Sequence, residues 1–376
     1  SAHRFLSDTY VNIPRHEIAR VSELLQAQLL QPINVNPVQP HLAVADLNII
    51  TNTGPTALGF NEFSPLTERN KSQLVASGLL GSNHTFGDEV VYSKLYDKTS
   101  ISVGQFHYES KGFRANNDQN HDIGNAFIQH AVTSKLNLQA ELRARRSEHG
   151  DLLLDFDPQT FQKNTHRKLD ENVARVGARY AVSSSQDLLL STSFIDRHDR
   201  RDNREFFLGD VSNSLGFQVE TQHLLRTTWF NSVVGGGVYR FDVTRKQLDL
   251  GADEALESKK LGLDRDNFYV YTNNSFIKNL NIVTGLSYDS FSNPSNDQER
   301  IDKINPKLGL QWDITNVMRL RLAWFEANKT HLIAQQTIEP TQVAGFNQFF
   351  DDPNGTRSRR MGAALDFHFA TNWYGG

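Results

Sequence analysis

The feature that most constrains this chain is a two-residue alternation of apolar and polar side chains. Between residues 136 and 145, leucine and alanine alternate with asparagine, glutamine, glutamate and arginine. The pattern recurs at 173–182, 280–289, 307–313 and 360–369. Successive side chains of a β-strand point to opposite faces of a sheet, so each stretch predicts a strand with one apolar and one polar face. Most stretches span about ten residues, the length of a tilted strand that crosses a lipid bilayer.

Connections of two lengths separate these strands. Short turns are expected at 133–135, 184–186, 278–279 and 315–316. Long polar connections are expected at 112–122, 148–170, 199–212, 245–265, 293–305 and 327–356. Strict alternation of short and long connections is typical of outer-membrane barrels, whose short turns face the periplasm, and has no reason to occur in a sandwich with one wet face.

We therefore predict an all-β fold, a transmembrane antiparallel up-and-down β-barrel of about 14 or more strands over residues 71–376. We expect this barrel to lie in the outer membrane of a Gram-negative bacterium and to be truncated at Gly376. Residues 1–70 are expected to form a plug-like or linker segment. Within it, apolar residues spaced by three and four predict one helix over 15–30, and prolines then predict irregular chain.

Composition agrees with a barrel and excludes several other classes. Hydrophobic residues make up 38% of the chain and the mean hydropathy is −0.50, as expected where only every second side chain of a strand meets lipid. No apolar run approaches the roughly 18 residues of a membrane-spanning helix. A net charge of −4 argues against a nucleic-acid partner. The absence of cysteine excludes thiol catalysis, disulfides and cysteine-ligated metals.

No enzyme, cofactor or metal site is predicted, because no nucleophile elbow, phosphate loop or compact set of metal ligands is present. Three glycines at 235–237 lie inside a strand pattern and predict a bend or a close approach of another group. Aromatic residues near strand ends, among them Phe194, Tyr239, Tyr269 and Trp312, predict girdles at the membrane boundary.

The polar faces of the predicted strands carry many charges. The candidates for lumen-facing residues are Arg143, Arg145, Arg175, Arg179, Arg319, Arg321, Glu141 and Glu220. Asp289, Asp313 and Asp366 lie on the same predicted face. One interpretation is a set of arginine–carboxylate pairs that stiffen the wall, which the presence of both signs favours. The alternative is a cationic path for an anionic solute, which predicts that Arg143→Glu or Arg179→Glu changes ion selectivity.

Several stretches resemble a group of large bacterial outer-membrane proteins with barrels similar to TonB-dependent receptors. They are QPINVNPVQP at 31–40, ADLNI at 45–49, GFNEF at 59–63, GQFHYE at 104–109 and TIEPTQVAGFNQFFDD at 337–352. The last stretch is the most specific. The resemblance implies the fold and the location, with tetratricopeptide repeats upstream in many members, and it carries over no individual functional residue. The chain departs from a full receptor in lacking a complete plug and a TonB box near Ser1.

These observations lead to one functional prediction and one alternative. The first is a TonB-dependent-receptor-like or porin-like barrel for transport or export of a solute or polymer. Its expected partners are outer-membrane lipid, lipopolysaccharide and periplasmic repeat or energy-coupling proteins. The alternative is a passive anchor for a periplasmic repeat domain that assembles a surface structure.

Overall fold

The computed structural model describes residues 38–40, 63–65, 70, 72–152, 158–159, 161–252, 254–293, 296–330, 337–340, 342–348, 355–370 and 373–375. All regular secondary structure in these ranges is β-strand. No helix in the described part of the chain is long and apolar enough to cross a membrane. The helix predicted over 15–30 lies outside the described residues, and so does most of the predicted plug-like segment.

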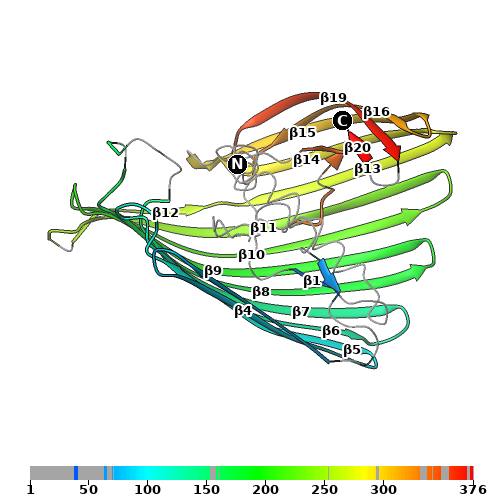
Figure 1. The fold of residues 1–376 in the computed structure, drawn as a ribbon. Coiled ribbons are helices and arrows are strands. Elements are labelled where there is room, and N and C mark those ends of the chain that lie inside the picture. Colours follow the sequence, from blue (N-terminus) through cyan, green and yellow to red (C-terminus); the bar gives the residue numbers. More distant parts are fainter. Residues whose placement is uncertain are drawn as a thin grey trace.

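Sixteen strands form one antiparallel sheet in which most strands lie beside the next strand in sequence (Figure 1). They are β3 (Ser72–Gly81), β4 (Thr85–Tyr96), β5 (Thr99–Ser110), β6 (Gln119–Ala131), β7 (Leu136–His149), β8 (Thr165–Ser183), β9 (Gln186–Asn203), β10 (Leu208–Arg226), β11 (Phe230–Asp249), β12 (Glu254–Gly262), β13 (Arg265–Ile277), β14 (Leu280–Asn293), β15 (Asn296–Thr315), β16 (Met318–Asn328), β19 (Arg357–Ala370) and β20 (Trp373–Gly375). Two separate pairs are β1 (Val38–Pro40) with β2 (Phe63–Pro65), and β17 (Gln342–Val343) with β18 (Phe346–Asn347). The predicted up-and-down topology of 14 or more strands is confirmed.

Several strands are longer than the sequence pattern indicates. Strands β8 to β11 have 18 to 20 residues, about twice the length that crosses a bilayer. The predicted long connections at 199–212, 245–265 and 293–305 are therefore largely wrong, because most of their residues continue the hairpins. The connections that follow β5 and β7 are long, as predicted. The missed strand portions are mostly polar, so they lack the regular apolar alternation while keeping the backbone ladder.

The two faces of the sheet differ in chemistry. One face exposes large apolar side chains, among them Leu142, Val176, Phe194 and Leu286. On β8 and β9 this band ends at one height: Ala174 pairs with Phe194 inside it, and Asn172 pairs with Asp196 just beyond it. The opposite face carries buried polar side chains. Such a pattern is the one expected of a barrel wall with a lipid-facing band and a polar interior.

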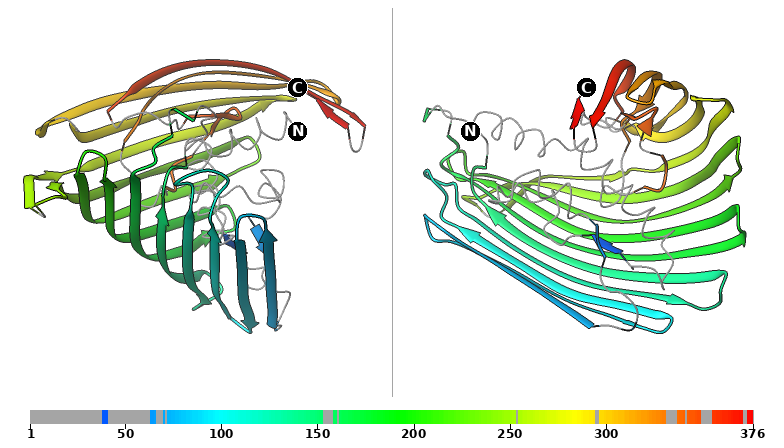
Figure 2. Two further views of the ribbon diagram at one scale, coloured as in Figure 1. Left: turned by 60° about the vertical axis from the view of Figure 1, so that its left-hand side comes forward. Right: turned by 45° about the vertical axis from the view of Figure 1, so that its right-hand side comes forward.

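The sheet curls, and the described residues between β16 and β19 lie within the curve (Figure 2). We call the face that they contact the concave face and the apolar one the convex face. Strand β3 forms one edge of the sheet, and β19 with β20 forms the other. No pairing joins these two edges among the described strands.

The predicted aromatic girdles are only partly correct. Phe194 and Trp312 are exposed on the convex face. Tyr239 and Tyr269 are buried on the concave face instead. Neighbouring residues of a strand point to opposite faces, so of the adjacent pair Phe268 and Tyr269 only Phe268 is exposed.

Candidate functional site

A buried ion pair connects β7 and β8 on the concave face. The Arg175 guanidinium donates to Glu141 through Nε at 3.2 Å and more closely through Nη2. Asn125 Nδ2 donates to the other Glu141 oxygen at 2.7 Å. Both charged side chains are nearly inaccessible to solvent. Buried charges persist only when they are paired and hydrogen-bonded, and this pair meets both conditions.

Most other arginines selected from the sequence also have carboxylate partners. Arg179 Nε lies 2.8 Å from Asp187 Oδ1, and Arg145 Nη2 lies 3.7 Å from Glu171 Oε1. Further along the sheet, Arg319 contacts Asp313 at 2.5 Å, and Arg321 contacts Asp366 at 2.5 Å. Arg143 shares the strand parity of Glu141 and Arg145. This geometry favours the interpretation of paired charges along the wall over a continuous cationic path.

The connection between β16 and β19 forms the most unusual part of the concave face. We call its described central residues, 337–340 and 342–348, the strap. The whole connection starts and ends at the end of the sheet opposite the short turns, because β16 ends there at Asn328 and β19 begins there at Arg357. The Ile338 side chain nevertheless packs against Leu189 and Leu224, close to the short-turn end. The strap therefore runs down much of the height of the concave face.

Glu220 on β10 anchors the start of the strap. It was selected from the sequence, and it is fully buried. Its carboxylate accepts hydrogen bonds from Thr337 Oγ1 at 2.5 Å, and from the Ile338 amide at 3.2 and 3.3 Å. Tyr239 Oη and Gln218 Nε2 donate to it from the wall at 2.8 and 2.6 Å. Hydrogen bonds to a charged group contribute about 1.5–3 kcal/mol each, so this carboxylate is a strong point of attachment.

Glu339 makes a second attachment, to β13. Its carboxylate accepts hydrogen bonds from Tyr271 Oη at 2.8 Å and Asn267 Nδ2 at 3.2 Å, and Arg265 Nη2 lies 3.5 Å away. Arg265 also donates to Asp289 Oδ1 at 2.6 Å. Two carboxylates thus share one buried guanidinium, which limits the charge left unpaired in this region.

Apolar packing holds the remainder of the strap. Val343 and Ala344 are buried in one cluster with Tyr269, Tyr271 and other residues of the wall. Phe346 lies against the Arg321 guanidinium, with 5.2 Å from its ring centroid to Cζ. Full burial of a side chain such as Val343 contributes about 1.5–3 kcal/mol, so the strap is a packed part of the fold.

The predicted close approach at the three glycines is observed at Gly235. A Cβ atom at this position would lie 2.5 Å from Tyr269 Oη and 2.6 Å from the Thr221 carbonyl oxygen. Tyr269 Oη in turn accepts a hydrogen bond from Gln222 Nε2 at 3.1 Å. Glycine is therefore required here so that the tyrosine can lie beneath the strap.

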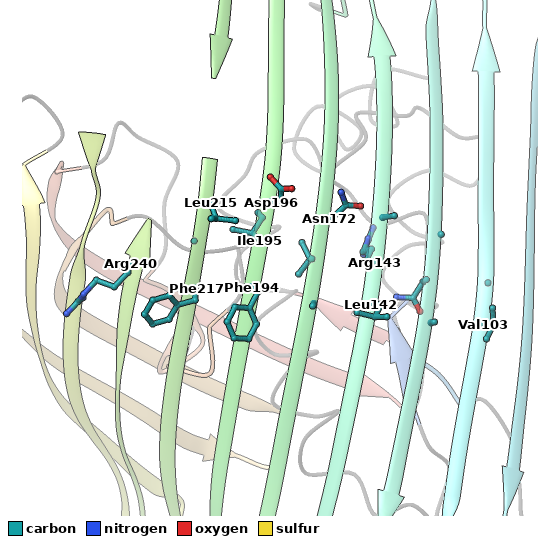
Figure 3. Close-up of a pocket in the computed structure, with 18 of the residues that line it drawn as sticks. Val103, Leu142, Arg143, Asn172, Phe194, Ile195, Asp196, Leu215, Phe217 and Arg240 are labelled. Carbon is teal, nitrogen blue, oxygen red and sulfur yellow. The ribbon is translucent and has the colours of Figure 1, made fainter. Parts of the chain in front are cut away.

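The convex face has a hollow of about 830 Å³ across β5 to β11 (Figure 3). Leu142, Phe194 and Phe217 lie beside it on three strands. Small residues such as Ala144 and Ala174 also line it. This hollow lies on the apolar face, opposite the strap and the buried charges.

Sequence reasoning identified Glu220 but missed the residues that surround the strap. The predicted lumen-facing residues do not include Glu339, Arg265, Asn267, Tyr271 or Gln222. Only Glu339 lies within the 337–352 stretch, which is the most specific part of the resemblance. Among the described residues, no group of three or more histidine, aspartate or glutamate side chains is arranged to hold a metal ion.

No protein-family model matches the chain, and no sequence of a curated protein matches it. Solved structures do. The chain is similar to the copper transporter OprC, with a TM-score of 0.63 and 11% identity over 80% of this chain and 52% of that one. It is also similar to the alcaligin outer-membrane receptor FauA from Bordetella pertussis, with a TM-score of 0.58 and 9% identity over 79% and 48% of the two chains.

The ferric yersiniabactin uptake receptor FyuA from Yersinia pestis gives a TM-score of 0.59 and 12% identity over 82% of this chain and 54% of its own. The chain spans about half the length of these three structures. Sequence identity this low establishes the fold alone. The resemblance drawn from the sequence is confirmed at that level: the chain folds like part of the antiparallel β-barrel of TonB-dependent outer-membrane receptors.

Proposed function

We propose that the chain forms part of the wall of an outer-membrane transport barrel, with the concave face lining the path of a hydrophilic solute or polymer. The observation that carries this proposal is the contrast between the two faces. The convex face exposes an apolar band, whereas the concave face buries polar and paired charged side chains beneath a strap that runs along it. A passive wall needs no such internal segment.

Two further considerations support transport. The solved structures of similar fold include a copper transporter and uptake receptors, and none is an enzyme by its description. Arg175 and Arg145 each have a carboxylate partner across β7 and β8, so both signs of charge are present on the concave face, which suits passage of polar solutes. Periplasmic energy-coupling proteins and lipopolysaccharide are the partners that this role implies.

The test is single-channel conductance of the full-length protein in planar bilayers. We expect small steps or none from the native protein, because the strap narrows the lumen. Replacement of residues 337–348 by a Gly-Ser segment of equal length is expected to give larger steps. A matched control replaces the turn at residues 204–207, which is remote from the strap, and is expected to behave as the native protein does. A folded strap variant that stays silent would contradict the proposal.

A further inference from the structure

The wall beneath the strap binds the main chain of one strap residue, Ile338, through two hydrogen bonds. The Ile338 amide N–H donates to the Glu220 carboxylate at 3.2 Å, and the Ile338 carbonyl oxygen accepts from Gln222 Nε2 at 2.5 Å. Glu220 and Gln222 are two residues apart on β10 and so project from the same face. An acceptor and a donor at this spacing bind the N–H and the C=O of a single residue, whatever side chain that residue carries.

Three neighbouring positions of the wall then recognise three consecutive side chains. Glu220 accepts the hydroxyl of Thr337, and an apolar recess of Leu189 and Leu224 holds Ile338. Tyr271, Asn267 and Arg265 surround the carboxylate of Glu339. The order along the bound chain is hydroxyl, aliphatic, acidic.

The strap leaves part of this wall unsatisfied. Arg265 Nη1 and Asn267 Oδ1 are buried and have no hydrogen-bond partner among the described residues. Both side chains are more than nine-tenths buried. A buried donor or acceptor without a partner is unfavourable, so the strap covers this wall without satisfying all of its polar groups.

We propose that this part of β10 and β13 is a binding site for an extended peptide segment, which the strap occupies in the resting protein. The ligand class is a polypeptide with a hydroxyl residue, an aliphatic residue and an acidic residue in succession. The inference rests on the proposed transport function and specifies its substrate class: an incoming peptide displaces the strap and so widens the path.

The probe is a fluorescently labelled, end-blocked peptide Thr-Ile-Glu-Pro, and the readout is fluorescence anisotropy with the full-length protein in detergent. We expect saturable binding at least tenfold tighter to the variant whose residues 337–348 are replaced by Gly-Ser than to the native protein. Gln222→Ala in that variant is expected to weaken binding at least tenfold. A control peptide with aspartate in place of isoleucine should bind at least tenfold more weakly.

A second variant covers failure of the strap replacement to fold. Ile338→Ala weakens the strap and leaves the wall intact, so it should bind the peptide several-fold more tightly than the native protein does. Lack of saturable binding to either variant, in a protein that keeps the heat-modifiable migration of a folded barrel, would overturn the peptide site. Conductance separates the two ideas: larger steps without peptide binding would retain transport and remove the peptide as its substrate.

Discussion

At the residue scale, the concave face can bury charged side chains because they occur as pairs of opposite charge. Glu141 and Arg175 are buried together, whereas Asp313 and Arg319 form a pair of similar chemistry that is about half exposed. The difference matters because a buried partner left alone has no water to replace the lost contact. The two pairs therefore provide an internal comparison.

We predict that Arg175→Met lowers the free energy of unfolding by about 3–5 kcal/mol, because it leaves Glu141 as an uncompensated buried charge. Combining it with Glu141→Gln should restore a large part of the loss. The control Arg319→Met should cost about 1 kcal/mol or less, since solvent screens an exposed pair. Urea unfolding in lipid vesicles measures all three; equal losses at both sites would show that Glu141 is solvated in the folded protein.

A second residue-scale prediction concerns Gly235. Gly235→Ala should destabilise the protein because the new methyl group collides with Tyr269 and the Thr221 carbonyl. Gly124→Ala provides the control, since a Cβ atom there meets nothing within 4 Å. Thermal unfolding in detergent compares the two. A Gly235→Ala protein as stable as Gly124→Ala would mean that Tyr269 does not lie against the glycine.

The sequence predicts the residues of the wall better than the residues of the strap. Alternation assigns Glu141 and Glu220 to the polar face because strand geometry is local. It cannot assign Glu339, whose contacts with Arg265 and Asn267 join residues more than 70 positions apart. Nothing in a local pattern records that a connection returns to the face of its own sheet.

At the element scale, the long hairpins extend beyond the apolar band. On β9, Asp199 lies past the height at which Asp196 ends this band. Its carboxylate accepts from Arg167 Nε at 2.9 Å and Nη2 at 2.8 Å, and from Arg197 Nη2 at 3.1 Å. The predicted solvated loop at these positions is therefore an ordered hairpin held by charge pairs. This part of the hairpin is mostly polar, so it lacks the apolar alternation that predicts a strand.

The pKa of the Asp199 carboxyl provides an element-scale prediction. Burial raises this pKa, but hydrogen bonds and charge from Arg167, with Arg197 and Arg201, lower it below its usual value overall. A lowered pKa in the folded protein means that the carboxylate stabilises the fold above about pH 4, and that this contribution is lost as the pH falls through the lowered value. Asp199→Asn should therefore cost about 1–3 kcal/mol at pH 7.

The measurement is the difference in unfolding free energy between the native protein and Asp199→Asn, followed from pH 7 to pH 3. We expect the difference to shrink toward the acid end. The same comparison for Asp210→Asn serves as a control, because Asp210 is exposed in the adjacent strand. A difference that is independent of pH would show that the Asp199 charge does not stabilise the hairpin.

At the scale of the whole molecule, a single up-and-down sheet accounts for both faces. Apart from β12 and the pairing of β16 with β19, each strand pairs with the next strand of the sheet in sequence, so the apolar band forms from pairings between successive strands. That regularity is why the fold class could be predicted from the sequence. The curl of the sheet around the strap could not, because it depends on contacts between segments far apart in the chain.

The central claim is that the convex face meets lipid and the concave face does not. The chain contains no cysteine, so single nitroxide labels can be placed with Leu142→Cys and Leu286→Cys on the convex face, and with Gln139→Cys and Ser287→Cys on the concave face. Collision with oxygen and with a water-soluble nickel chelate is then measured by electron paramagnetic resonance in lipid vesicles. We predict high oxygen and low nickel accessibility at the first two sites, and low oxygen accessibility at the other two. Nickel reaching Leu142→Cys and Leu286→Cys freely would place the convex face in water and contradict the barrel.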